Sequence, residues 1–314
     1  MPLNTASYQA VQRDLTVVFK NELKAATPFY PQLCTIVPST GADEKYSWLG
    51  GLPGMREWVG PRRFNQLRGA DYTLKNKTWE SGIEVEKEHL EDDRMGQYRM
   101  QIGQLAEEAA FHPDELLFEN IVNLAESEAC FDGQYFFDTD HSWGDSGTQS
   151  NDLTFDATDH TDVTETEFRA AFHQALIKLL GFKNDQGKPY VRPRVGRLGN
   201  LVVAVPLALY EVALKAFDQT TLATGEDNFI IEKPTVVCIP YMGAEYTNGS
   251  DVKFDLYYTG GKLKPYVFQA RRPLRALAWK GADDAESRVM KAMTDARYNI
   301  GFLAWWTAVR TTFT

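Results

Sequence analysis

The chain has 314 residues, of which 43% are hydrophobic and 24% charged, and these values exclude a disordered or fibrous protein and predict a fold of more than one lobe. Its three cysteines have no short spacing between them, which excludes a disulfide framework and a zinc knuckle. No basic region followed by an apolar one begins the sequence, and the most apolar run, 201–210, is about half a membrane span. We therefore expect reduced cysteines and a cytoplasmic setting without a membrane.

The charges are distributed unevenly along the chain, whose net charge is -10. Residues 45–79 contain seven basic and two acidic residues, whereas residues 80–167 contain three basic and 24 acidic ones. A basic segment beside an acidic one favours electrostatic pairing between copies of the chain, and the overall acidity argues against a protein that grips nucleic acid. The alternative, that the acidic residues only solvate the surface, is left open by the sequence.

The N-terminal part of the sequence predicts an arm followed by a long hairpin. A helix over residues 8–26 ends before Pro28, and nothing around it in the sequence supplies a core of its own. Residues 45–88 resemble two strands joined by a segment rich in Gly, Pro and Arg, and they carry Trp48, Trp58 and Trp79. Because an isolated ribbon is marginal in water and indoles are costly to expose, we expect these rings to be covered by a partner surface.

The middle of the chain changes to a helical period. Apolar residues three and four apart predict one long helix over 95–127, with a Pro-Asp-Glu helix start at Pro113 inside it. The polar stretch that follows, up to about residue 163, is interpreted as loop. Thr164 and Glu167 then form a capping box that predicts a helix ending at Gly181.

The second half predicts a mixed α+β lobe and a set of late strands. Residues 201–205 are a buried strand, Pro206 opens a helix to about residue 217, and strands are expected at 229–231 and 236–239. Asn248-Gly249 precedes an alternating strand over 252–258, which is a strong hairpin signal. Two strand-like stretches, 274–279 and 290–309, close the chain. The fold class is therefore α+β.

The usual catalytic motifs are missing from the sequence. Neither Gly-Lys pair has the first glycine of a phosphate-binding loop, there is no HExxH, and the segment 144–148 has Thr where a nucleophile elbow needs Gly. One enzymatic alternative stays open. Asp138, Asp140 and His141, with Asp159 and His160, would give a metal-dependent hydrolase if they held a divalent ion. Short acids in such a loop more often form turns, which is the reading that we favour.

Several blocks of sequence, in order, resemble the Mu-like major head subunit (gpT) family. The likeness extends over about residues 28–306. The blocks are 34–40 (CTIVPST), 46–50 (YSWLG), 55–60 (MREWVG), 88–93 (EHLEDD), 111–116 (FHPDEL), 131–141 (FDGQYFFDTDH), 264–269 (KPYVFQ) and 295–302 (DARYNIGF). Each block alone is weak, and the combination is specific.

The resemblance implies a major capsid protein of a tailed bacteriophage with the Hong Kong 97-type (Johnson) fold. It divides the chain into an N-terminal arm, an extended loop, a peripheral domain with a spine helix, an axial domain and the returning strands of the peripheral domain. The expected boundaries are 1–44, 45–90, 91–161, 162–258 and 259–314.

As function, the resemblance implies self-assembly through pentamers and hexamers into an icosahedral shell that encloses double-stranded DNA without sequence-specific binding. No reaction, cofactor or metal is expected. The implied partners are a scaffold protein, a portal and a head–tail connector, and the expected location is the virion capsid, assembled in the bacterial host cytoplasm. Another phage component, of the tail or portal, is the structural alternative.

The contacts between copies are expected to lie on the predicted hairpin. Indoles and arginines are the residue types that most often dominate protein interfaces, and a basic hairpin suits an acidic neighbour. The predicted contact residues are Trp48, Leu49, Arg56, Trp58, Val59, Arg62, Arg63, Arg68 and Trp79.

Overall fold

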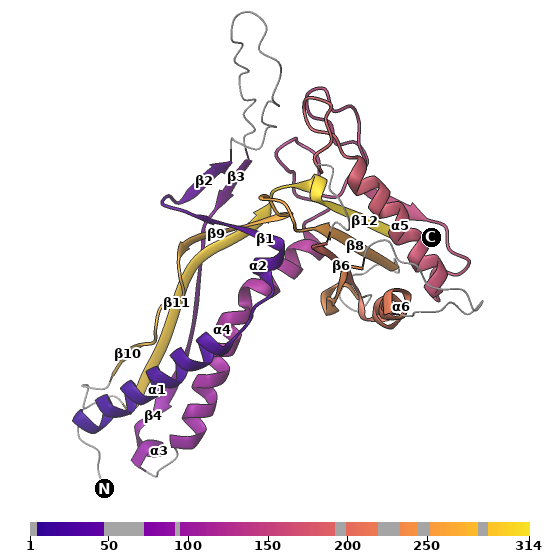
Figure 1. Cartoon of the computed structure of the whole chain (residues 1–314). Coiled ribbons are helices and arrows are strands. Elements are labelled where there is room, and N and C mark those ends of the chain that lie inside the picture. The colour runs from indigo at the N-terminus through magenta and orange to yellow at the C-terminus, as the bar shows by residue number, and fades with distance from the viewer. Residues whose placement is uncertain are drawn as a thin grey trace, which may run out of the picture.

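The computed structural model describes residues 5–46, 72–91, 95–191, 199–218, 233–243, 252–281 and 288–314. These residues form two lobes, each built on a five-stranded sheet. An elongated lobe contains the long strands β4 and β11 with helices α1 and α4, and a second lobe contains β6, β8 and β12 with α5 and α6 (Figure 1). The α+β class expected from the sequence is confirmed.

The elongated lobe is organised around β11 (Val289–Phe302). Along one edge β11 pairs antiparallel with β4 (Lys77–Glu86), and along the other it pairs with β9 (Tyr266–Arg272) and β10 (Ala278–Lys280). β1 (Cys34–Pro38) lies parallel to β9 at the outer edge. The resulting sheet is called the first sheet below.

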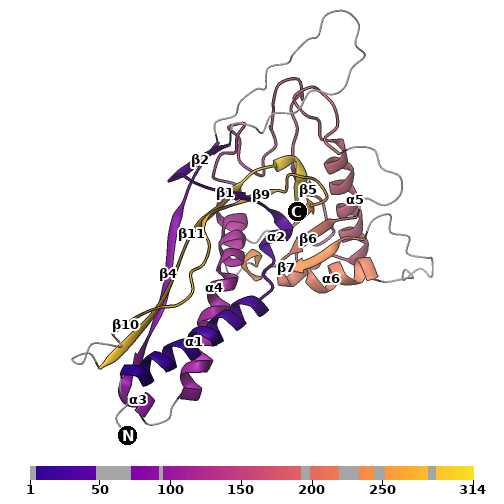
Figure 2. The same cartoon turned by 60° about the vertical axis from the view of Figure 1, so that its left-hand side comes forward.

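Helices α1 (Thr5–Ala25) and α4 (Met95–Asn123) cover one face of the first sheet (Figure 2). Leu15 and Phe19 of α1 are fully buried with Ile102 of α4 and Met290 of β11 in a core separate from the main one. The N-terminal helix therefore has no core of its own, as predicted, and shares one with α4 and the sheet. The long helix through Pro113 is also confirmed. Short helices α2 (Tyr30–Leu33) and α3 (Lys87–Glu91) precede β1 and α4.

The second lobe has the strand order β5-β12-β8-β6-β7. Helix α5 begins with the predicted capping box, in which Thr164 Oγ1 accepts from the Glu167 backbone N–H and Glu167 accepts from that of Thr164. The helix packs against α6 and against the sheet. The elements are β5 (Asp152–Phe155), α5 (Glu165–Gly181), β6 (Leu201–Val205), α6 (Leu207–Asp218), β7 (Thr235–Cys238), the 3₁₀ turn η1 (Pro240–Met242), β8 (Val252–Tyr258) and β12 (Ala308–Phe313).

Three expectations about strands are wrong. The stretch 274–279 is strand only from Ala278, where β10 begins. The stretch 290–309 is not one strand, because the chain leaves the first sheet after Phe302, forms the 3₁₀ turn η2 (Trp305–Thr307) and enters the second sheet as β12. β5 lies inside the predicted loop and pairs with β12. Trp305, in the turn between β11 and β12, is 1% exposed, so its ring is buried where the chain passes from one sheet to the other. The predicted strand at 229–231 and the turn at Asn248-Gly249 lie outside the described residues.

The predicted hairpin is only partly correct. β2 (Asp43–Tyr46) and β3 (Tyr72–Lys75) do pair antiparallel and form its stem. The continuation of the returning strand, β4, does not pair with the outgoing strand and belongs to the first sheet along ten residues of β11. Alternation of side chains predicted the strand and could not identify its neighbour.

The stem packs closely on the first sheet at Gly301. A Cβ atom at this position would lie 2.5 Å from the Tyr72 hydroxyl oxygen and 3.0 Å from Leu74 Cδ1. We expect Gly301→Ala to lower the free energy of unfolding of the dissociated subunit by about 1–3 kcal/mol in urea denaturation, because the added methyl group overpacks the contact. Gly96→Ala, with nothing within 4 Å of its Cβ, is the control and should not destabilise the subunit. Equal stability of the two variants would contradict this packing.

Candidate assembly surface

The hairpin stem is fixed to the first sheet by buried polar contacts. The Tyr46 hydroxyl donates to Gln269 Oε1 at 2.9 Å, and Gln269 Nε2 donates to the Leu74 carbonyl at 3.1 Å. The Phe302 backbone N–H donates to the Tyr72 hydroxyl at 3.0 Å. Burial raises the pKa of both tyrosines, so each stays protonated. Tyr46 and Tyr72, which flank segment 47–71, are therefore held in place.

Eight of the nine predicted contact residues lie outside the described residues. These are Trp48, Leu49, Arg56, Trp58, Val59, Arg62, Arg63 and Arg68. They fall in segment 47–71, which contains four arginines, one glutamate and one aspartate. Their contacts with another copy stay a prediction.

Trp79 is the exception, and its predicted setting is wrong. The residue lies on β4 and is half-buried, and its indole N–H donates to the Tyr298 carbonyl at 3.0 Å. Its ring centroid lies 4.5 Å from that of His112 on α4. The indole is thus partly covered within its own chain because β4 pairs with β11 beside α4, where the sequence had suggested a projecting ribbon. Its contact with another copy stays a prediction.

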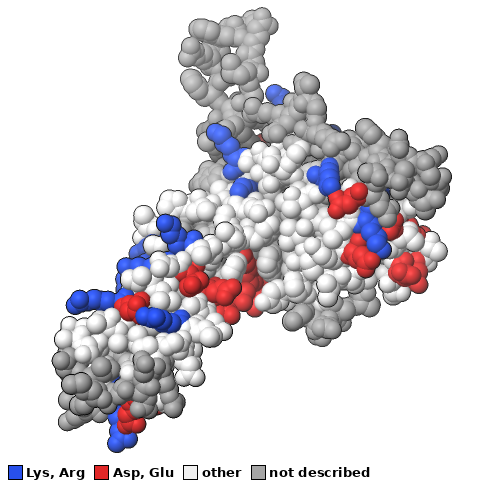
Figure 3. Space-filling model, turned by 60° about the horizontal axis from the view of Figure 1, so that its bottom comes forward, with Lys and Arg blue, Asp and Glu red and all other residues white. Residues whose placement is uncertain are grey.

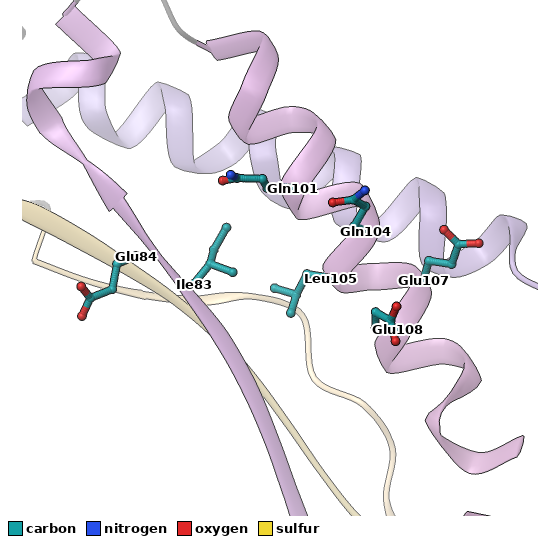
Figure 4. Close-up of a pocket in the computed structure, with 7 residues that line it drawn as sticks. All are labelled: Ile83, Glu84, Gln101, Gln104, Leu105, Glu107 and Glu108. Carbon is teal, nitrogen blue, oxygen red and sulfur yellow. The ribbon is translucent and has the colours of Figure 1, made fainter. Parts of the chain in front are cut away.

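A groove lined by acidic residues runs between α4 and β4 (Figure 4). Ile83 from β4 and Leu105 from α4 point toward one another across it. Its remaining lining residues are Glu84, Gln101, Gln104, Glu107 and Glu108, around a volume of about 770 Å³. A second depression continues it past Trp79 and shares Glu108. We call Glu80, Glu84, Glu107, Glu108 and Glu115 the acidic groove.

The acidic groove has little internal charge compensation. Among the described residues only Glu84 of this set forms an ion pair, with Lys291 at 2.8 Å. Figure 3 shows acidic side chains gathered toward the middle of one face, with basic ones along an edge of the elongated lobe. His112 lines the second depression, and burial lowers its pKa despite the opposing effect of Glu115 and Glu119. A neutral imidazole cannot offset these carboxylates, so the groove suits a basic segment.

The alternative metal site does not form. His141 Nδ1 lies 2.7 Å from the Asp132 carboxylate, both side chains are fully buried, and the imidazole stacks on Trp305 with centroids 4.0 Å apart. The Asp138 carboxylate accepts from the Thr139 and Tyr135 backbone N–H groups, as in a turn.

Asp159, which the sequence grouped with these residues, accepts instead from Thr161 in a turn of its own. Across the described part of the chain, no group of three or more His, Cys, Asp or Glu could hold a metal ion. The sequence missed the Asp132–His141 pair, whose nine-residue separation fits no standard motif. None of the described helices is long and apolar enough to cross a membrane.

Comparison with known proteins places these features in a family. Residues 8–163 match the family described as Mu-like prophage major head subunit gpT. The Mu-like prophage FluMu major head subunit of Haemophilus influenzae is 39% identical over 149 residues, which are 47% of this chain and 48% of that protein. The major capsid protein of Escherichia phage Mu is 33% identical over 141 residues, 45% of this chain and 46% of that protein. The similarity thus covers about half the length of each relative.

The fold is similar over a greater length than the sequence. The chain matches a subunit of the procapsid of bacteriophage JBD30 with a TM-score of 0.58 and 24% identity, over 99% of this chain and 76% of that one. At this identity the likeness speaks for the fold alone, and it is that of phage capsid proteins, the Hong Kong 97-type. The match of residues 8–163 to the family shows that the chain belongs to the Mu-like prophage major head subunit family.

Proposed function

We propose that the chain is a major capsid protein whose copies assemble through pentamers and hexamers into a closed icosahedral shell around double-stranded DNA. The observation that carries the proposal is that one subunit contains two complementary features. A hairpin stem is anchored on the first sheet at the ends of an arginine-bearing segment, and an acidic groove lies along α4 in the same lobe. The basic segment of one copy is complementary to the groove of the next.

This contact is heterologous, because the surface that one copy presents differs from the surface that it contacts on its neighbour. Such contacts close into rings or shells when the rotation between copies permits. Each exposed ion pair contributes only about 0.2–1 kcal/mol. Since a subunit in a shell makes several contacts at once, effective concentration holds the assembly together.

The DNA and the accessory partners belong to the same proposal. An acidic chain gives low affinity for phosphate, so the enclosed DNA is held without sequence-specific contacts and slides along the wall during filling. A scaffold protein, a portal and a head–tail connector complete the particle, which is assembled in the host cytoplasm and ends as the virion capsid. The proposed domains are an arm over 1–44, an extended loop over 45–90, a peripheral domain over 91–161 and 259–314 and an axial domain over 162–258. Within the extended-loop range, β4 pairs with β11 of the first sheet.

Particle formation by the expressed chain tests this function. Negative-stain electron microscopy of the chain, alone and with its scaffold partner, should reveal closed shells. Rings or tubes in place of shells would instead favour a portal or tail component.

Trp58→Ala tests the extended loop within that assay. We expect the variant subunit to keep the far-ultraviolet circular dichroism and the thermal unfolding of the parent and to lose most intact particles, because a large aromatic anchor is removed from the contact. Unchanged particle yield would contradict a role for this indole.

A further inference from the structure

Four arginines gather at one corner of the first sheet. Arg271 and Arg272 end β9, Arg275 follows them, and Arg297 of β11 is the register partner of Arg272. Arg271, Arg272 and Arg297 line a depression of about 490 Å³ together with Ser39 and Thr40, which follow β1. We call the four residues the arginine corner.

The carboxylates near the arginine corner are too few to neutralise it. Asp295 pairs with Arg272 and lies 3.6 Å from Arg275. Glu44 accepts from the Ser39 hydroxyl at 2.9 Å and from the Thr40 backbone N–H at 2.8 Å, and these bonds lower its pKa with a smaller effect of Arg271. In the described part of the chain, Asp295 and Glu44 thus oppose four guanidinium groups, and Glu80, the register partner of Asp295 on β4, is a further carboxylate on that face.

Arg297 has no partner in the part of the chain that the structure describes. Among the described residues its side chain makes no hydrogen bond and no ion pair, and its Nε atom is buried and unsatisfied, as is that of Arg272. Partial burial lowers the pKa of Arg272, and the charges of Arg275 and Arg297 lower it further. A buried, unpaired donor on a cation is costly. The corner therefore has the donors and the excess charge that an anion would satisfy.

The arginine corner and the acidic groove open on opposite faces of the first sheet. Ala296 and Tyr298 line the depression next to α4, whereas Arg297 between them lines the other one. Successive side chains of a strand point to opposite faces. One copy can therefore present Glu107, Glu108 and Glu115 of α4 on one side of its elongated lobe and unpaired guanidinium groups on the other. Glu80 and Glu84 of β4 are register partners of Asp295 and Lys291 and share the face of Arg297.

The chemistry of the corner fits a carboxylate. A guanidinium group presents a planar fork of donors that binds the two oxygens of a carboxylate, or of a phosphate, side by side. A site for the DNA backbone needs basic residues spread as a stripe along the duplex. Here the basic residues are concentrated at one point of a chain with 24 acidic residues between 80 and 167.

We propose that the arginine corner binds an aspartate or glutamate of residues 80–167 in a second copy of the chain. This inference rests on the proposed shell, since it supplies a second charged contact between copies, distinct from that of the extended loop.

Substitution at Arg297 tests the contact in particles assembled without nucleic acid. Arg297→Ala should lower the yield of intact particles about fivefold, the effect of roughly 1 kcal/mol, while the dissociated subunit unfolds as the parent does. Arg288→Ala, which removes an exposed arginine just before β11, is the matched control and should assemble normally. If the parent chain forms no particles, the proposed function fails. If the parent assembles and Arg297→Ala assembles equally well, only the arginine corner fails.

Crosslinking identifies the ligand directly. Arg297→Lys provides an amine that a carbodiimide can join to a touching carboxylate, with loss of water and formation of an amide bond. Particles made from mixed light and heavy isotope-labelled subunits should yield a peptide containing position 297 joined to an acidic peptide of the other label from residues 80–167. Absence of such mixed links, or an Arg297→Ala defect confined to DNA-filled particles, would overturn the assignment, the latter in favour of DNA phosphate.

Discussion

Replacing Arg310 by alanine should lower the free energy of unfolding of the subunit by about 3–5 kcal/mol, because it leaves a buried carboxylate unpaired. Arg310 is 1% exposed and binds Asp255 through two hydrogen bonds, from Nε at 2.7 Å and Nη2 at 2.8 Å. Asp255 is fully buried on β8 and also accepts from the Tyr257 hydroxyl at 2.9 Å. The pKa of Arg310 is raised, since Asp255 outweighs the opposing effect of burial.

Arg310 also joins the two lobes. Its Nη2 donates to the Ile121 carbonyl on α4 at 3.2 Å, its Nη1 bonds Glu126 just beyond that helix, and its guanidinium lies 4.1 Å from the Phe137 ring centroid. The stability lost in Arg310→Ala should therefore appear as a lower urea midpoint for unfolding of the dissociated subunit and as a lower yield of particles than that of the parent.

A double-substitution cycle separates this explanation from simple loss of packing. Asp255→Ala combined with Arg310→Ala should cost less than the sum of the single changes, because no buried charge is then left unpaired. Lys215→Ala, which breaks an exposed pair with Glu211 at 2.7 Å, is the control and should cost under about 0.5 kcal/mol. Additive losses in the cycle would contradict the argument.

Reversing the charge of the acidic groove should abolish most particle formation. Glu107→Arg with Glu108→Arg places two cations where the basic segment of a neighbour is expected, and repulsion then repeats at every such contact of the shell. We expect at least about a tenfold drop in particle yield, which corresponds to about 1.4 kcal/mol per subunit. The subunit itself should stay folded, because both side chains are exposed and unpaired among the described residues.

A compensating substitution makes this test specific. Arg62→Glu with Arg63→Glu should also prevent assembly, and the four changes together should restore part of the yield if the two sites meet. Glu128→Arg, at an exposed acid away from the groove, should leave assembly near the parental level. Two defective pairs with no recovery in combination would mean that the extended loop contacts another surface.

Local structure was predictable where residues close in sequence determine it. The capping box of Thr164 and Glu167, the helix through Pro113 and the buried strand 201–205 all follow from patterns within a few turns or residues, and each is present. The resemblance to a capsid family was likewise visible in the sequence, because it depends only on short blocks of residues and on their order. In natural sequences local preferences mostly agree with the global fold, so short-range patterns predict local structure.

Contacts between distant segments were not predictable in this way. Trp79 is hydrogen-bonded to Tyr298, far along the chain, and the sequence had placed the indole on an exposed ribbon. The arginine corner brings residues after β1 together with β9 and β11, and only the Arg271-Arg272 doublet was visible as a signal. Alternation along a strand determines which of its side chains share a face, and it does not determine which other strand pairs with it.

The amino-acid sequence by itself determined the helices, several of the strands, the α+β class, the uneven charge and the family. Only the tertiary structure decided that β4 pairs with β11, that β12 leaves the first sheet for the second, and that His141 faces Asp132 and not a metal. The physical reason is that strand pairing and burial are settled by the free energy of the whole packed chain, in which a strand or an ionisable group takes the neighbour that leaves the fewest polar groups unsatisfied.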